Sequence, residues 1–268
     1  MMEEKSILLA EMTWEEIKEA TGPETVVVLP VGSTEQHGPH MPVKTDHYFV
    51  YEIAKRAAKK ASERTRVVVA PVLPFGCSGA HADFPGTISI DHQTYIELIR
   101  ELGESILGQG FERLFILNGH GGNFGALTLA AKDLYDSTNA TIAVACYWHL
   151  AAKEIAALRE SPPGGISHAC EMETSCMLAL DPSAVRWEKA KKSIPQWKSK
   201  YVLDDLLGGG QVVPALHVAD FSPTGVMGDP TIATKEKGER FLEAIVNEVA
   251  AFIVDFAGWD LDQMCTFE

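Results

Sequence analysis

The chain lacks several features that mark specialised protein classes. Its five cysteines are odd in number and show no CxxC spacing, which argues against a disulfide framework and favours a reducing compartment. No apolar run reaches the roughly 18 residues of a membrane span. The first residues, Met1 to Lys5, lack the basic-then-apolar pattern of a signal peptide. We therefore expect a cytoplasmic protein with no membrane partner.

Positive charge is also scarce, with 23 Lys and Arg against 37 Asp and Glu and a formal net charge of −14. Because phosphate contacts need clustered Lys and Arg, this balance argues against a nucleic-acid partner. Basic residues are dense only between 189 and 200, which we interpret as solvated surface. The remaining composition, 46% hydrophobic and 22% charged, is typical of a globular protein. A length of 268 residues suits one large α/β domain or two small ones.

Apolar runs and helical periodicities alternate along the chain at the spacing of βα units. Strands are predicted at 26–31, 66–70, 111–117 and 141–147, and helices at 46–63, 91–108, 123–137, 169–180 and 235–259. The segment 183–232 gives no clear pattern. No internal repeat, low-complexity tract or linker interrupts the alternation, so we expect a single domain over residues 1–268.

Two polar clusters follow two of the predicted strands. The sequence from Val31 to Gly38 is VGSTEQHG, and that from Asn118 to Asn123 is NGHGGN. If the two strands are neighbours in a parallel sheet, both clusters emerge at its carboxyl edge, where open α/β folds build sites. Carboxylate oxygens and imidazole nitrogens suit zinc, manganese or iron. The sequence therefore predicts a centre for one or two divalent ions, with the ligands Glu35, His37, Asp46 and His120.

Each part of this centre has a plainer interpretation. Glu35 and His37 alone also fit an ordinary loop, and Asp46 is placed to cap the helix that follows it. We favour a bridging role for Asp46, which is a recurrent device in two-metal sites. The glycines around His120 also suggest a dinucleotide loop, but Phe124 stands where a third glycine is expected. No Gly-Lys-Ser/Thr sequence is present to form a P-loop.

A third polar cluster, Ser167 to Ser175, opens the helix predicted at 169–180. Helix capping and the helix dipole explain one carboxylate there, but not the histidine beside it. Two carboxylates and a histidine at the start of a buried helix are costly unless a cation or a proton transfer uses them. We expect Glu171 to be a further metal ligand and catalytic group, His168 to transfer protons, and Glu173 to assist by orienting a ligand.

Taken together, the motifs resemble those of the creatininase family of metal-dependent amidohydrolases. The matching segments run in the family's order from residue 32 to 230: Gly32–Gly38, Asp46, Phe84–Ser89, Asn118–Asn123, His168–Ser175 and Gly225–Pro230. The resemblance implies a three-layer α/β/α sandwich with a mostly parallel central sheet. It also implies a two-metal centre with a bridging water, hydrolysis of non-peptide or small amide C–N bonds, and a homo-oligomer, often a hexamer.

The resemblance also implies roles for individual residues. Glu35, His37, Asp46 and His120 fall on metal-ligand positions, His168 on the catalytic histidine, and Ser78 on a substrate contact. Creatininases carry a glutamate ligand two residues after the equivalent of His120, where this chain has Gly122, so we expect Glu171 to supply that carboxylate. They also carry a tryptophan on the loop before the catalytic histidine. The corresponding segment 161–167 has no aromatic residue, which leaves Trp148 as the candidate to line the substrate pocket.

These patterns predict a metal-dependent amidohydrolase that acts on a small amide or cyclic amidine. Within the family, the alternatives are creatinine, a formamidopyrimidine nucleotide or a modified precursor peptide, and the two departures argue against creatinine. A two-metal phosphoesterase would use similar ligands, but no Arg or Lys stands beside the motifs. The third alternative is a non-catalytic protein whose metal site is closed by protein ligands.

Overall fold

A computed structural model describes residues 7–208, 210–261 and 263. Its central sheet has four strands, β1 (Val26–Val31), β2 (Val67–Val69), β3 (Arg113–Asn118) and β4 (Thr141–Cys146), in the order β2-β1-β3-β4. All neighbouring strands of this sheet run parallel. Cys265 and the first six residues, which entered the sequence analysis, lie outside the described part of the chain. The other four cysteines are free and buried.

The strands are apolar on both faces because the sheet has a hydrophobic core on each side. Val26 and Val28 of β1 pack into one core together with Phe115 of β3, while Val27 and Leu114 pack into the other. This arrangement explains why the strand sequences are continuous apolar runs and do not alternate with polar residues. It also requires a layer of helices on each side.

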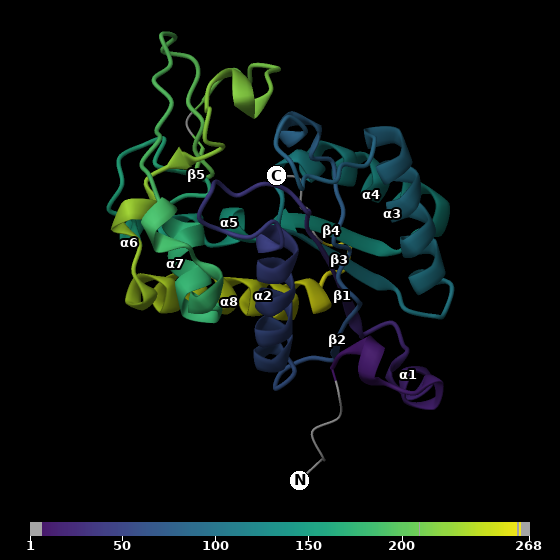
Figure 1. The fold of residues 1–268 in the computed structure, drawn as a ribbon. Helices are drawn as coiled ribbons and strands as arrows, with labels where there is room; N and C mark the ends of the chain where they lie inside the picture. Colours follow the sequence, from purple (N-terminus) through teal and green to yellow (C-terminus); the bar gives the residue numbers. More distant parts are fainter. Residues whose placement is uncertain (1–6, 209, 262, 264–268) are drawn as a thin grey trace.

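Helices cover both faces of the sheet, as Figure 1 shows. On one side lie α2 (Thr45–Ala61) and α8 (Lys235–Ala257), with α7 (Glu171–Leu180) packed against α8. On the other lie α3 (His92–Leu107) and α4 (Phe124–Thr138), and α1 (Trp14–Ala20) contributes to the same core. The three-layer α/β/α prediction is confirmed.

Some elements differ from the prediction. The strand predicted to reach residue 147 stops at Cys146, because Tyr147 begins the short helix α5 (Tyr147–Leu150), followed by α6 (Ala152–Leu158). Residues Ile166–His168 form β5, which pairs antiparallel with β6 (Met227–Gly228), and neither short strand is among those predicted. The segment without a clear pattern holds short 3-10 turns at Pro182–Ala184, Trp187–Lys189, Val218–Asp220 and Pro230–Ile232. Three further turns are Leu9–Glu11, η2 (Gly79–His81) and Gly121–Asn123.

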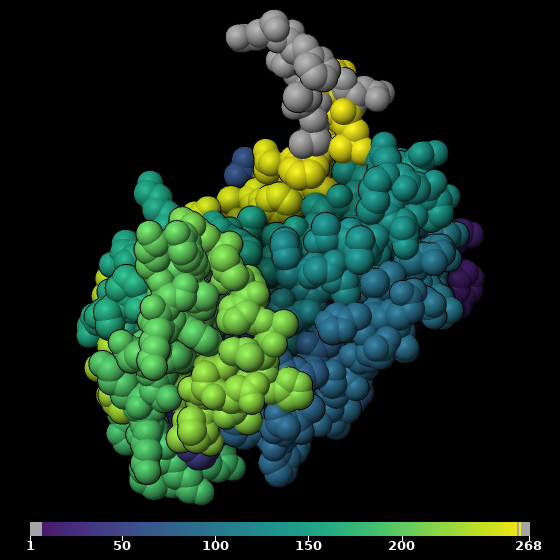
Figure 2. Space-filling view, turned by 90° about the horizontal axis from the view of Figure 1, so that it is seen from above, coloured from purple at the N-terminus to yellow at the C-terminus, as the bar shows by residue number. Residues whose placement is uncertain are grey.

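Within the described residues, no helix is long and apolar enough to cross a bilayer. Figure 2 shows the molecule from above. In this view the surface is hollowed between the green segment that precedes β6 and the blue segment that contains η2.

The packing of α7 on α8 predicts the effect of adding one methyl group. A glycine in the middle of a helix normally costs about 0.5–1 kcal/mol relative to alanine, so its replacement usually stabilises. At Gly238 of α8, however, a Cβ atom would lie 1.8 Å from the carbonyl oxygen of Ser175 on α7. We expect Gly238→Ala to lower the free energy of unfolding by roughly 1–3 kcal/mol, because the two helices must separate.

The measurement is chemical unfolding followed by circular dichroism, with Gly125→Ala as the matched control. Gly125 lies in α4, and a methyl group added there would have no neighbour within 4 Å, so this variant should be as stable as the wild type or slightly more stable. Equal stability of Gly238→Ala and Gly125→Ala would contradict the close contact between α7 and α8.

Candidate metal centre

The two polar clusters meet at the carboxyl edge of the sheet, as predicted. β1 and β3 are parallel neighbours, and Val31 at the end of one strand is in register with Asn118 at the end of the other. The loop after β1 therefore brings Glu35 and His37 next to His120, which follows β3. Asp46 reaches the same point from the first turn of α2.

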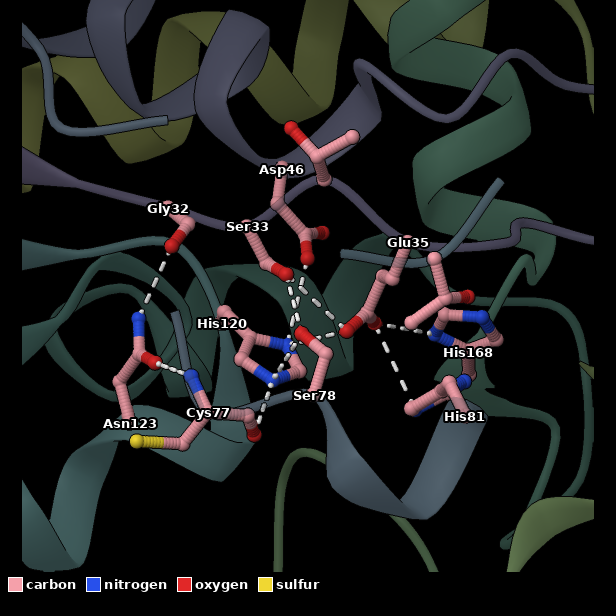
Figure 3. A network of polar contacts seen from close by, with 12 residues as sticks. Gly32, Ser33, Glu35, Asp46, Cys77, Ser78, His81, His120, Asn123 and His168 are labelled. Carbon is pink, nitrogen blue, oxygen red and sulfur yellow. Dashed lines mark hydrogen bonds and ion pairs between the residues drawn. The ribbon is translucent and has the colours of Figure 1, made fainter. Parts of the chain in front are cut away.

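Asp46 lies between two imidazoles, one on each of its carboxylate oxygens. Its Oδ1 is 3.0 Å from His37 Nε2, and its Oδ2 is 3.2 Å from His120 Nδ1. Glu35 Oε2 lies 3.2 Å from the same nitrogen of His120, and Glu173 Oε1 lies 3.8 Å from His37 Nε2. Two buried groups that could each hold a metal ion thus share Asp46: Glu35, Asp46 and His120, and His37, Asp46 and Glu173. The convergence of Asp46, Glu35 and His120 is visible in Figure 3.

Several atoms that face this centre have no hydrogen-bond partner among the residues that the structure describes. Glu35 Oε1, His37 Nε2 and Asp46 Oδ2 are buried, and none of them makes a hydrogen bond with adequate geometry. Buried polar atoms are rarely left in this state without a bound ion or water, because their desolvation is costly. The donor set of carboxylate oxygens and imidazole nitrogens is one that zinc and manganese accept, so the residues fit a metal.

Electrostatics at the centre favour a cation. Burial lowers the pKa of His37, but Asp46 and Glu173 raise it well above its ordinary value. Burial likewise lowers the pKa of His120, while Glu35 and Asp46 together raise it well above its ordinary value. Both histidines therefore feel an excess of carboxylate charge, which a divalent ion would neutralise.

Backbone carbonyl groups orient the two histidines. His37 Nδ1 lies 3.2 Å from the carbonyl oxygen of Glu35, and His120 Nε2 lies 3.2 Å from that of Cys77. Since a carbonyl oxygen can only accept, each of these nitrogens carries a proton, which leaves the other ring nitrogen facing the centre, where it could bind an ion. Cys77 is held in place in turn, because its N–H donates to Asn123 Oδ1 over 2.8 Å (Figure 3).

His168, the last residue of β5, lies beside the same centre. Its Nε2 lies 2.7 Å from the carbonyl oxygen of Gln36, and its Nδ1 lies 3.6 Å from Glu35 Oε1. Its ring lies against that of His37, with centroids 4.2 Å apart. Burial and the neighbouring His37 lower the pKa of His168, which favours a neutral imidazole with its Nδ1 lone pair facing Glu35.

Comparison with known proteins identifies the scaffold. The family model described as "Creatinine amidohydrolase" matches residues 10–253, most of the chain. The chain belongs to the creatininase family.

Relatives within the creatininase family are hydrolases with different substrates. The chain is 34% identical over 234 residues to the mycofactocin precursor peptide peptidase of Mycobacterium tuberculosis, covering 83% of this chain and 82% of the relative. It is 30% identical over 263 residues to the creatinine amidohydrolase of Pseudomonas putida, covering 92% and 95%. Two solved creatininases, a mutant described as "Zn-Zn type" and one described as "Creatininase Mn", align at 27% and 28% identity. Each has a TM-score of 0.80 and covers 94% of this chain and 98% of its own.

Glu171 was predicted to be a metal ligand and catalytic group, but the structure does not place it in any of the groups of potential ligands. Its buried carboxylate accepts hydrogen bonds from Lys237 Nζ at 2.8 Å and from the backbone N–H groups of Ser161 and Glu160 at 2.9 and 3.1 Å. Residues two apart on a helix are rotated by about 200°, so Glu171 and Glu173 cannot face the same side. Glu173 is the one that faces His37.

The backbone around Gly122 leaves no room for a side chain. A Cβ atom at residue 122 would lie 2.3 Å from the carbonyl oxygen of Cys77 and 2.6 Å from His120 Nε2. Those are the two groups whose hydrogen bond orients His120. No side chain fits there on this backbone, so the glutamate that creatininases are expected to carry at this position has no room.

The two residues predicted to contact substrate lie in different surroundings. Ser78 is buried beside the centre, hydrogen-bonded to Ser33 Oγ and 3.4 Å from His120 Nε2. Trp148 belongs to a hydrophobic core and packs edge-to-face with Tyr147, with ring centroids 5.0 Å apart. A substrate contact stays a prediction for both residues.

Two residues at the centre were missed from the sequence. His81 Nε2 lies 3.5 Å from Glu35 Oε1, and Gln36 lies between His81 and His168. His81 is only three residues from Ser78, but nothing in the spacing links it to the metal-binding motifs. Gln36 stands between two predicted ligands, and no pattern in the sequence assigns a role to its own side chain.

The two glutamates of α7 can be distinguished by substitution. We expect Glu173→Gln to lower the bound zinc or manganese of the purified protein, because a carboxylate leaves the centre. Glu171→Gln should keep its metal but lose stability, by about 3 kcal/mol, because a buried Lys237 loses its buried partner.

Metal content by elemental analysis and thermal unfolding of both variants provide the test. The control is Glu160→Gln. Glu160 lies 3.1 Å from Lys237 Nζ but is largely exposed, so this variant should change neither the metal content nor the stability by much. Loss of metal in Glu171→Gln with full retention in Glu173→Gln would reverse the assignment.

Proposed function

We propose that the protein is a metal-dependent hydrolase that cleaves the C–N bond of a small amide or cyclic amidine. The observation that supports this most strongly is the position of Asp46, with one oxygen in each of two buried groups of potential ligands. A carboxylate shared in this way is typical of two-metal hydrolases. The zinc and manganese in the descriptions of related creatininases agree with this donor set.

The chain's residues would divide into two ion sites. Glu35 and His120 would hold one ion, His37 and Glu173 the other, and Asp46 would contact both. Divalent ions bound there would lower the pKa of a neighbouring water from roughly 15.7 to about 7 and polarise a carbonyl oxygen. Burial of all five residues keeps bulk water away and strengthens each of these electrostatic interactions.

His168 is placed to transfer the proton. Its Nε2–H is committed to the carbonyl of Gln36, so Nδ1 is free to take a proton from water as the water oxygen bonds to the carbonyl carbon. The same nitrogen then gives that proton to the departing nitrogen as the C–N bond breaks. Positioned acid–base groups of this kind typically contribute roughly 10²–10⁴-fold in rate.

A peptide amide is the second candidate substrate. Of the two relatives described above, the precursor peptide peptidase is the more similar, at 34% identity. The loop from Ser161 to Ser167 also carries no aromatic side chain that would close over a small ring. A cytoplasmic location and a homo-oligomer, such as a hexamer, stay predictions.

Metal removal is the first test of the proposed function. We expect the chelator-treated protein to lose amidase activity and to regain it when zinc or manganese is added back. The panel would contain creatinine, formamides, other small amides, short peptides and nitrophenyl phosphate. Full amidase activity after complete metal removal would refute the proposal, as would phosphatase activity without cleavage of any amide.

Substitution of the proton-transfer residue is the second test. We expect His168→Ala to lower kcat by roughly 10²–10⁴-fold while the metal content remains that of the wild type. The control is His149→Ala, because His149 is exposed on α5 and packs against Phe124. Parallel loss of metal and activity in His168→Ala would instead make His168 a ligand, which the group Glu35, His37 and His168 also allows.

A further inference from the structure

The side chain of Gln36 determines where the protons lie on its neighbours. Its Oε1 accepts the N–H of Gly38 over 2.8 Å, so its Nε2 faces the opposite way. That Nε2 lies 3.2 Å from the carbonyl oxygen of Gly225 and 2.9 Å from His81 Nδ1. Both contacts agree with the same amide orientation, and together they use both of its N–H donors.

The Gln36 amide fits only because residue 225 is a glycine. Gly225 has a φ of +75°, and a Cβ atom there would lie 2.0 Å from Gln36 Oε1. The backbone at Gly225 therefore packs directly against the Gln36 amide. The carbonyl oxygen of Gly225 accepts from Gln36 Nε2 and so fixes the orientation of the amide.

The tautomer of His81 follows from this orientation of the Gln36 amide. Because Gln36 donates to His81 Nδ1, that nitrogen must be the acceptor, and Nε2 carries the proton. An imidazole with one accepting nitrogen and one N–H is neutral. Its Nε2–H faces Glu35 Oε1 at 3.5 Å, and that oxygen makes no hydrogen bond with adequate geometry. The N–H is therefore available to another acceptor at the centre.

His168 has the same tautomer but presents its other nitrogen. Two contacts compete for its Nε2, the carbonyl oxygen of Gln36 at 2.7 Å and the Gln36 amide nitrogen at 3.0 Å. The carbonyl is nearer and can only accept, so Nε2 is the donor and Nδ1 presents a lone pair. The rings of His81 and His168 lie 4.5 Å apart, and a donor from one and an acceptor from the other face the same oxygen of Glu35.

We propose that His81 is a further catalytic residue, whose Nε2–H donates a hydrogen bond to the substrate oxygen as negative charge develops on it. This inference rests on the proposed amide hydrolysis. Gln36 is then a positioning residue, which keeps His81 as a donor while its backbone carbonyl keeps His168 as an acceptor. Removal of one such oxyanion donor typically costs about 10²–10³-fold in kcat.

The first experiment reads the tautomers directly and needs no substrate. Protein labelled with ¹⁵N at histidine, in metal-free and zinc-loaded forms, should show a neutral Nε2–H tautomer for His81, assigned by its loss in His81→Gln. Gln36→Glu keeps the acceptor for Gly38 but removes the amide donor, so His81 should switch to Nδ1–H. A wild-type His81 with its proton on Nδ1, or no switch in Gln36→Glu, would overturn the inference.

The second experiment separates catalysis from metal binding. We expect His81→Leu to lower kcat by about 10²–10³-fold at unchanged metal affinity and nearly unchanged KM. His81→Gln should recover part of kcat, because its amide can donate, and His149→Gln should match the wild type. Loss of metal affinity in step with kcat would overturn the catalytic role and leave His81 orienting Glu35.

The outcomes also distinguish this inference from the proposed function. If the metal-loaded wild type cleaves no amide, the proposed function fails, and the catalytic role of His81 fails with it, whatever the tautomer. If it cleaves an amide but His81→Leu retains full kcat, only the present inference is overturned. If the His81 variants fail to fold, the inference can still be tested by comparing the wild type with Gln36→Glu. Gln36→Glu should change the His81 tautomer and lower kcat.

Discussion

The centre depends on a buried carboxylate held between two imidazoles. Asp46 contacts His37 through one oxygen and His120 through the other, at the end of a sheet whose interior is apolar. Taking that charge out of water is expensive, so the surrounding structure has to compensate it. The neighbouring histidines, which backbone carbonyls orient, compensate part of that charge. A bound cation would complete the compensation and would also satisfy the buried atoms that lack a hydrogen-bond partner.

Much of the fold and part of the centre could be predicted from the sequence. The apolar runs at β1 and β3 are long enough to be recognised as buried strands, and parallel pairing then forces the residues that follow them to the same edge. This logic brought together Glu35, His37 and His120, because each lies within a few residues of a strand end. Metal binding by these residues, and a single domain over 1–268, stay predictions.

The features that could not be predicted depend on how helices are rotated about their axes and on contacts between residues far apart in the sequence. The choice between Glu171 and Glu173 is set by which side of α7 faces the sheet edge, and the decisive partner, Lys237, lies on another helix. His81 reaches the centre from a 3-10 turn in a long loop, where no periodicity fixes its direction. The short strand β5 was missed because it pairs with β6, which lies about sixty residues later in an irregular segment.

The crowding around Gly122 has an evolutionary consequence. A carboxylate cannot be gained at this position by one substitution, because the space is already filled by the Cys77 carbonyl and the His120 ring. A lineage that gained a carboxylate here would first have to reroute the chain near Cys77, and only then could the new side chain fit beside the centre. The order of those changes is therefore constrained by epistasis. A glutamate transferred alone to position 122 from a creatinine-cleaving relative would clash with the present backbone.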